Sequence, residues 1–532
     1  MNRRVFNRVA VMDYIVICLT VLGIYGWHLD GQFLAWDDDQ FIVNNPNVAH
    51  LSIENIKWAF AGIRFDAYQP LQFISYMVDG SLWPSDAFGY KLHSVILFML
   101  AAVLLFFLLR RHGFSPFASL LGTLMFVAAP SRVESVIWVS ARKDVLTLAL
   151  ALFAWHFHLL QPKSRAGRSI IWAIEYLLFI CALLAKSSAL VLPFLLLVMD
   201  VLWYRISWQK ALLRNGFPIL ISFGVAVFLP RLWQESQLIN ILVPDGVFMR
   251  TGLVFWSVYR FCYSILWPFS LSPLYAAPDE QTLRIAFGVG MAVTVIFMAG
   301  LIGLHRHRWL NIKWVALLLM FFIGLAPFLN IVPMYYLVAD RYLLFPSLAI
   351  ALAVPLLLEA KSPSKSPSAE IQWPMRNQWT RIGLAVVVVA GIAINGVSAS
   401  LYAARWQDSE TFFATAVARQ PHSFWAQMKY GETLRINRNF TLAEQAYRAA
   451  RSIRPLSPSA LGGVFWTTFE QDCITQHRDC HDAMDVTAHM VTQGSNVRKL
   501  ITLRRKLSRA GFSKSAGVIG ERLQQMGYPG LR

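Results

Sequence analysis

Charged residues are scarce in this sequence. Its 532 residues include 30 acidic and 48 basic side chains, whereas 56% of the residues are hydrophobic. A soluble core does not require so much apolar surface, so the composition excludes an ordinary soluble protein. A membrane-spanning helix needs about 20 mostly apolar residues. Runs nearly free of charge occur at residues 95–109, 146–160, 170–184 and 385–401. The sequence therefore predicts an all-α, polytopic membrane protein.

Acidic residues are nearly absent from the short segments between the apolar runs, where basic residues gather. In a soluble protein the net charge of +18 would suggest a nucleic-acid partner; here we interpret the bases as topology signals and expect no nucleic acid. Basic loops face the cytoplasm in the predicted threading. The inner loops are then residues 110–115, 162–168, 204–216, 305–313 and the linker 359–381. This threading gives about eleven transmembrane helices, with the N-terminus in the cytoplasm.

Two further signals are missing or sparse. No small-x-small cleavage pattern follows the apolar stretch at residues 12–28, so we expect an uncleaved anchor rather than a signal peptide. There are five cysteines, and three of them fall in apolar runs. The other two, Cys473 and Cys480, lie in the predicted outer domain, where they form a disulfide or stay as two free thiols.

The longest polar segment before the C-terminal region spans residues 30–88. This outer loop is acidic and too long to be a simple connector. Apolar residues recur at helical spacing in residues 51–60 and 71–82. The loop is therefore predicted to hold amphipathic helices that lie on the membrane surface.

After residue 402 the composition becomes that of a soluble helical domain. Pro421 and Pro455 stand 34 residues apart (455 − 421), and small residues between them allow paired helices to approach closely. This arrangement is typical of a tetratricopeptide (TPR) unit, and a generic helical bundle is the alternative. We expect a transmembrane domain at residues 1–402 and a short TPR-like helical domain at residues 403–532, which lies in the periplasm of a bacterial cell if the membrane is the inner membrane.

Charged residues at the outer membrane edge are costly unless they are paired or used. A sheltered carboxylate can serve as a general base toward an acceptor hydroxyl, and Arg or Lys can stabilise charge on a departing phosphate. For each residue alone, an ion pair or a hydrated loop is the competing interpretation. As a set, the following residues are candidates to line one cavity: Asp37, Asp38, Asp39, Arg132, Glu134, Arg142, Lys143, Asp144, Lys186, Arg231, Arg250, Arg260, Asp340 and Arg341.

Several motifs occur in an order that matches one family. The first outer loop carries Trp36-Asp37-Asp38-Asp39 followed by Phe41-Ile42 and Asn45-Pro46. Further matches are Tyr68-Gln69-Pro70, Gly89-Tyr90-Lys91-Leu92-His93, Pro130-Ser131-Arg132-Val133-Glu134, Arg142-Lys143-Asp144, Ala185-Lys186, Trp267-Pro268 and Asp340-Arg341-Tyr342. In these motifs the chain resembles the GT-C superfamily of glycosyltransferases. More narrowly, it is similar to bacterial relatives of the transmembrane-and-TPR-containing protein O-mannosyltransferases.

This resemblance implies a GT-C-like fold and an inverting transfer of a monosaccharide from a polyprenyl-phosphate donor. It places the family's carboxylate pair on Asp37, as the base that takes the acceptor's proton, and on Asp38, as a helper; which of the two is the base stays open. Lys186 and Arg341 would hold the lipid phosphate, with Arg260 as a weaker candidate. Glu134 and Arg142 would shape the sugar pocket, and Tyr342 would contact substrate beside Arg341. The acceptor would be a protein or a glycan, docked by the TPR-like domain.

Two departures from the family pattern matter. Its usual His-Pro-x-His around the third helix is Ala129-Pro130-Ser131-Arg132 here, so a metal or proton-relay role at this place is doubtful. The repeat array is also short, which puts acceptor binding by that domain in question. We name no metal ligand. The sequence leaves open whether a divalent cation helps to position the phosphate.

Three other functions compete with protein O-glycosylation. One is a glycan-modifying or other lipid-linked transferase, which could use the same machinery. A transporter would normally show paired half-repeats, broken helices or ionisable groups at the bilayer midplane, and the sequence reveals none clearly. A non-catalytic scaffold would use a degenerate GT-C domain only to anchor the repeats. Asp37, Asp38, Lys186 and Arg341 at motif positions argue against a scaffold.

Overall fold

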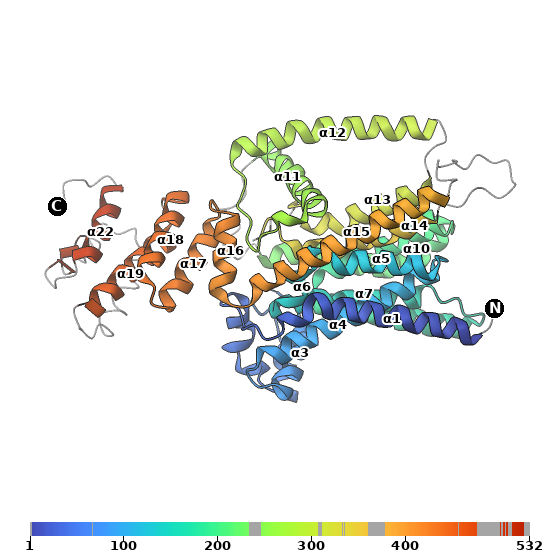
Figure 1. Ribbon diagram of the computed structural model, residues 1–532, viewed down its shortest axis with the longest axis horizontal. Coiled ribbons are helices and arrows are strands. Elements are labelled where there is room, and N and C mark those ends of the chain that lie inside the picture. Colours follow the sequence, from blue (N-terminus) through green and yellow to red (C-terminus); the bar gives the residue numbers. More distant parts are fainter. Residues whose placement is uncertain are drawn as a thin grey trace. The chain divides into compact units, whose positions relative to one another are not determined.

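The computed structural model describes residues 3–65, 67–233, 246–306, 311–331, 334, 336–359, 378–455, 457–475, 501, 504–505, 507–508 and 513–525. Within these residues every regular element is a helix and no strand occurs, which confirms the all-helical prediction. The chain divides into two compact units (Figure 1). The first comprises Met1–Leu271 with Pro278–Gln407, and the second comprises Ser272–Ala277 with Asp408–Arg532.

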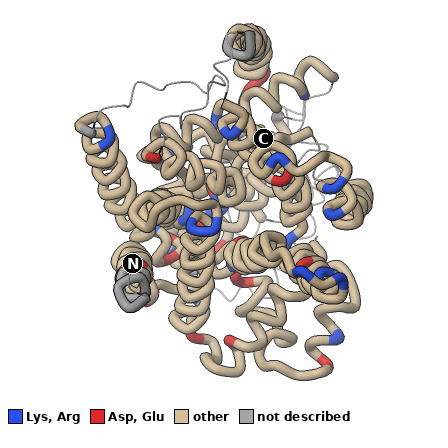
Figure 2. The backbone as a smooth tube through the Cα atoms, turned by 90° about the vertical axis from the view of Figure 1, so that its right-hand side faces the viewer, with Lys and Arg blue, Asp and Glu red and all other residues tan. Residues whose placement is uncertain are grey.

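In the described part of the first unit, six helices are long and apolar enough to cross a membrane. They are Val11–His28, Ala87–Arg111, Arg165–Ala185, Trp208–Phe228, Glu280–Gly300 and Trp379–Trp406. Shorter apolar helices occur at Ser187–Trp203, Ile312–Phe328 and Ser347–Leu358. Long stretches of backbone without a charged residue are visible in Figure 2. The helices thus have the composition of a membrane protein, and the total of eleven crossings stays a prediction.

The first unit is built around a helix that packs most extensively against three others. This helix, α4 (Ala87–Arg111), contacts α1 (Arg3–Tyr25), α5 (Pro116–Ala128) and α7 (Arg142–His158). Its neighbours extend the packing: α8 (Arg165–Ala185) lies on α7, α14 (Ser347–Leu358) and α15 (Gln378–Ala403) lie on α5, and α13 (Ile312–Leu325) lies on α14. Other pairs are α9 (Leu192–Val198) with α10 (Trp208–Trp233), and α11 (Val247–Leu266) with α12 (Glu280–Arg306). Helix α10 begins inside the loop predicted at residues 204–216, so that loop is shorter than expected.

One helix is broken at a proline. Helix α5 ends at Ala128, and α6 (Val133–Ile137) continues at an angle of 60° after the 3₁₀ turn Pro130–Arg132. A proline has no backbone N–H and cannot continue the hydrogen-bond pattern of α5, which explains the break. The sequence analysis found no clear broken helix, so the break between α5 and α6 differs from the expectation. The bend places the buried Glu134 inside the unit rather than along a straight span.

The two helices of the acidic outer loop behave differently. Helix α2 (Ile53–Phe60) exposes Ile53 and Phe60, as an amphipathic surface helix would. Helix α3 (Pro70–Leu82) instead buries Gln72, Tyr76 and Asp79 against the rest of the unit, and the position of residues 71–82 on a membrane surface stays a prediction. The polar residues on its inner side bind partners from α7 and from the turn before it, which periodicity alone does not reveal.

The second unit is a series of helices in which each packs on the next. They are α16 (Ser409–Arg419), α17 (Phe424–Ile436), α18 (Phe440–Ile453), α19 (Pro458–Thr475) and α22 (Ser513–Gln525). Gly431 of α17 lies so close to the Tyr447 ring of α18 that an added Cβ would approach it to 3.0 Å. The small residue therefore allows the close packing that the sequence predicted, while the TPR assignment stays a prediction. Cys480 falls outside the described residues, so the predicted disulfide does too.

Candidate functional site

Asp38 fastens the acidic outer loop to the start of α7. The carboxylate is buried, with 1% of the residue exposed, and accepts hydrogen bonds from the backbone N–H of Leu34 and of Ser140, each at 2.9 Å. The Ser140 hydroxyl also donates to it. Ser140 belongs to the 3₁₀ turn Val139–Ala141, which leads directly into α7. Both carboxylate oxygens of Asp38 therefore accept hydrogen bonds from the protein, and this residue positions the loop relative to α7.

Burial raises the pKa of Asp38 to about 6, although the hydrogen bonds from Ser140 and Leu34 work in the opposite direction. Its neighbour Asp37 is only half-buried, and its charge attracts Lys143 in the first turn of α7. Of the two carboxylates, Asp37 is thus the more accessible to a second reactant.

The turn before α7 is held from a second direction by α3. Gln72 donates from Nε2 to the Ser140 carbonyl at 2.9 Å, and the Tyr76 hydroxyl donates to the Val139 carbonyl at 2.9 Å. The carbonyl groups of this turn are therefore paired with buried side chains of α3. This double attachment fixes where α7 begins and hence where its first side chains lie.

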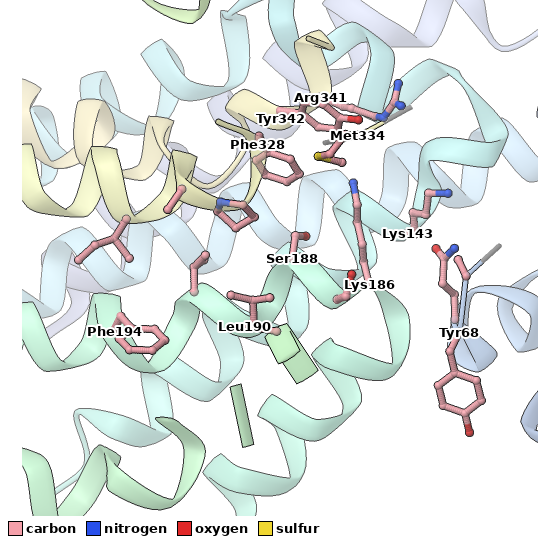
Figure 3. Close-up of a pocket in the computed structure, with 18 of the residues that line it drawn as sticks. Tyr68, Lys143, Lys186, Ser188, Leu190, Phe194, Phe328, Met334, Arg341 and Tyr342 are labelled. Carbon is pink, nitrogen blue, oxygen red and sulfur yellow. The ribbon is translucent and has the colours of Figure 1, made fainter. Parts of the chain in front are cut away.

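A cavity of about 590 Å³ lies beside this end of α7. Three basic residues, Lys143, Lys186 and Arg341, contribute to its wall. In Figure 3 they lie toward one side of the set of lining residues, whereas Leu190 and Phe194 lie toward the other. The wall otherwise consists mainly of apolar side chains, among them Val191, Phe223, Ala226, Ile323, Pro327 and Phe328. The cavity combines a basic end with an apolar end.

Two of the three cations are paired with buried carboxylates. Lys186 Nζ donates to Asp144 Oδ1 at 2.5 Å. The Arg341 guanidinium forms an ion pair with Glu134, which also accepts the Arg341 backbone N–H at 2.9 Å. Because Glu134 and Arg341 are 207 residues apart, this pair joins α6 to the 3₁₀ turn Asp340–Leu343.

Aromatic rings surround the paired cations. The rings of Tyr342 and Phe328 stack with centroids 4.1 Å apart, and Lys186 Nζ lies 5.7 Å from the Tyr342 centroid. The Arg341 guanidinium lies 5.3 Å from the ring of Trp138, which in turn stacks on Trp36 at 4.2 Å. Trp36 precedes Asp37, so the aromatic stack connects the acidic loop with the basic end of the cavity. Such contacts stabilise a cation without removing its charge.

Of the predicted site residues, Lys186, Arg341 and Tyr342 line the cavity. Glu134 pairs with the lining residue Arg341, and the charge of Asp37 attracts the lining residue Lys143. Arg142 is fully buried on the other side of α7, where it pairs with Asp79 and donates to the Tyr90 carbonyl and Ser94. Arg260 lies on α11, with its guanidinium 5.4 Å from the Tyr263 ring, and is not among the lining residues. The structure therefore does not bring Arg142 and Arg260 to the cavity wall.

Sequence reasoning assigned no role to Lys143. It appeared among the outer bases and in the motif Arg142-Lys143-Asp144, and the signal that distinguishes it from Arg142 is helical geometry. Consecutive residues in a helix point about 100° apart, so Arg142 and Lys143 face different surroundings. The pairing of Asp144 with Lys186 was equally beyond reach because it joins residues 42 positions apart.

In the described residues there is no group of three or more His, Cys, Asp or Glu side chains that could hold a metal ion. The role of a divalent cation stays an open prediction. Comparisons with protein-family models, with curated proteins and with solved structures give no match to this chain.

Proposed function

We propose that this protein is a membrane glycosyltransferase of the GT-C type, which moves a monosaccharide from a polyprenyl-phosphate donor to an acceptor hydroxyl. The observation that carries the proposal is the cavity with a basic end and an apolar end. A polyprenyl phosphate has the same two-part character, an anionic head group joined to a hydrocarbon chain. Basic side chains attract the phosphate, and burial of the chain against apolar walls adds hydrophobic stabilisation.

The half-buried Asp37 is the residue we assign to the chemistry. The acceptor hydroxyl would give its proton to Asp37 while its oxygen attacks the anomeric carbon of the sugar. The bond from that carbon to the phosphate oxygen breaks at the same time, so the polyprenyl phosphate leaves with the electron pair and the anomeric configuration inverts. Cations near the phosphate stabilise the charge on the leaving group. Asp38 supports this reaction by holding the loop that carries Asp37.

The finer assignments rest on the family resemblance in the sequence and belong to the same proposal. They are a GT-C fold with about eleven crossings, a cytoplasmic N-terminus, an active face in the periplasm of a bacterial inner membrane, and a TPR-like domain that docks a protein or glycan acceptor. Protein O-glycosylation is the reaction that we favour.

The test is transfer of labelled sugar from a panel of polyprenyl-phosphate sugars to periplasmic extract, with mass spectrometry of the products. We expect transfer by the wild type and a loss of about 10²- to 10⁴-fold in Asp37→Asn, because general-base catalysis contributes on that scale. Glu54→Gln, which removes an exposed carboxylate of α2 in the same loop, should retain wild-type activity.

Folding of each variant is checked by its elution and its unfolding temperature in detergent. If folded wild-type protein binds a polyprenyl phosphate but transfers sugar from no donor, the proposal of an enzyme fails in favour of a transporter or scaffold. If Asp37→Asn keeps full activity and Asp38→Asn loses it, the base has been assigned to the wrong carboxylate.

A further inference from the structure

The three cations at the cavity differ in how their charge is balanced. Lys186 and Arg341 each have a carboxylate partner in direct contact, Asp144 and Glu134 respectively. Both are also surrounded by aromatic rings. A cation that is already paired gains less from a ligand phosphate, since its charge is largely balanced and the new contact competes with an existing one.

Lys143 has an aromatic neighbour but no carboxylate partner in contact. Its Nζ lies 5.2 Å from the centroid of the Phe41 ring, and in the described part of the chain no carboxylate oxygen lies within 4 Å of it. The negative charges of Asp37 and Asp144 attract Lys143, and the positive charges of Lys186 and Arg341 repel it. Of the three cations that line the cavity, Lys143 is therefore the one without a carboxylate in contact.

The place of Lys143 in its helix makes this charge more unusual. It is the second residue of α7, a helix of 17 residues, and the N-terminal end of a helix carries a partial positive charge. A lysine in the first turn is thus unfavourable for folding, and an anion is favourable there. In Figure 3 Lys143 lies between Arg341 and Tyr68, next to the end of the cavity where the cations gather.

We infer that Lys143 is the residue that selects an anionic head group in this cavity, and that Lys186 and Arg341 chiefly shape the cavity and maintain its fold. This inference rests on the proposed function, because it assigns the phosphate of the donor to one residue. A single uncompensated cation suits a head group with one negative charge, such as a phosphodiester. Asp37 attracts Lys143, so a phosphate held by Lys143 would lie near the residue that we propose as the base.

The test measures binding of two lipids of equal chain length to purified full-length protein in nanodiscs. They are a polyprenyl methyl phosphate, a phosphodiester with one negative charge, and the uncharged polyprenol. We expect the wild type to prefer the phosphate. Lys143→Met should weaken phosphate binding at least tenfold and leave polyprenol binding unchanged, whereas Lys143→Arg should retain most of the preference. Lys163→Met removes one positive charge from an exposed loop and serves as the matched control.

Lys186→Met separates the two roles that we assign to the cations. We expect it to lower the unfolding temperature more than Lys143→Met does, since it leaves Asp144 buried without its partner. Equal phosphate binding by the wild type and by folded Lys143→Met would overturn the inference while the proposed function stands. Absence of any preference for the phosphate in the wild type would instead contradict the proposed function itself.

Discussion

Helix α7 carries a cluster of charged residues at each end, and the two clusters are built differently. Its 17 residues span about 25 Å. At the N-terminal end, Lys143 and the pair Lys186–Asp144 adjoin the cavity, and the Lys186 side chain is 13% exposed. At the C-terminal end, His158 is 1% exposed and lies between Glu175 on α8, at 2.7 Å, and Asp200, at 3.1 Å.

The C-terminal cluster is closed by further partners. Arg214 of α10 pairs with Glu175 at 3.0 Å, and Asn215 donates to Asp200 at 3.1 Å. Each carboxylate thus contacts two polar side chains, and the cluster joins α7, α8, α10 and the π-helical turn Met199–Trp203. None of its residues lines the cavity. The comparison teaches that a buried charged residue points to a ligand when two conditions hold: it lies beside a cavity, and no opposite charge of the protein contacts it.

The largest effect should come from opening the closed cluster. His158→Phe keeps a ring of similar size but removes both contacts to Glu175 and Asp200, so two buried carboxylates each lose a partner. Breaking a buried ion pair by removing one partner costs about 3–5 kcal/mol. We expect a loss of about 3 kcal/mol or more in the free energy of unfolding, measured by titration with SDS in mixed micelles.

His156→Phe is the matched control for this change. His156 lies on the same helix and bonds the Leu104 carbonyl at 2.9 Å, without a carboxylate. It should cost clearly less than His158→Phe. Equal losses in the two variants would mean that the His158 cluster contributes no more than any buried ring, and the contrast between the two ends of α7 would disappear.

A smaller effect should mark the N-terminal end of α7, where Asp38 holds the preceding turn. The pKa of Asp38 in the folded protein, about 6, lies above the ordinary value, so the folded state binds this proton more tightly than the unfolded chain does. The stabilisation that comes from protonated Asp38 is therefore present at low pH and is lost as the pH rises from about 4 through the folded pKa of about 6. One pKa unit corresponds to about 1.4 kcal/mol.

The measurement compares unfolding of the wild type and of Asp38→Asn from pH 4 to pH 7. We expect the wild type to lose up to about 3 kcal/mol relative to the variant over this range, and the difference to level off about one pH unit above the folded pKa. Glu54→Gln, on the exposed α2, should show no such trend. A difference that grows in favour of the wild type with rising pH would mean that the hydrogen bonds from Ser140 and Leu34 outweigh burial.

Much of the fold was accessible from the sequence because apolar runs translate directly into helices. The runs at residues 95–109 and 170–184 fall inside α4 and α8. Small residues such as Gly431 correctly indicated close helix packing in the second unit. Residues 71–82 show a limit of the sequence: helical periodicity indicates that one face is apolar, but it does not show that protein buries the polar residues Gln72 and Asp79 of the same helix.

The site was accessible only in part. Motif positions indicated Glu134 and Arg341 separately, and the structure pairs them. The sequence could not show that Asp38 would accept hydrogen bonds from Ser140, 102 residues away, or that Lys143 would be left without a contacting carboxylate. Both depend on packing between distant segments. Which charges neutralise one another is therefore the information that the structure adds, and the same information separates the two ends of α7.

The smallest change in the free energy of unfolding should come from breaking an exposed ion pair. This change is the reference against which the buried pairs are compared. Arg284 and Glu280 of α12 lie 2.5 Å apart at helical spacing, and their side chains are 61% and 65% exposed. Solvent screens such a pair, and holding two long side chains in one geometry costs entropy, so its net contribution is below about 0.5 kcal/mol. We expect Arg284→Met to leave unfolding in mixed micelles within that limit. A loss as large as that of His158→Phe would show that exposure does not separate strong from weak pairs in this protein. The comparison between the closed cluster and the cavity cations would then need a cause other than burial.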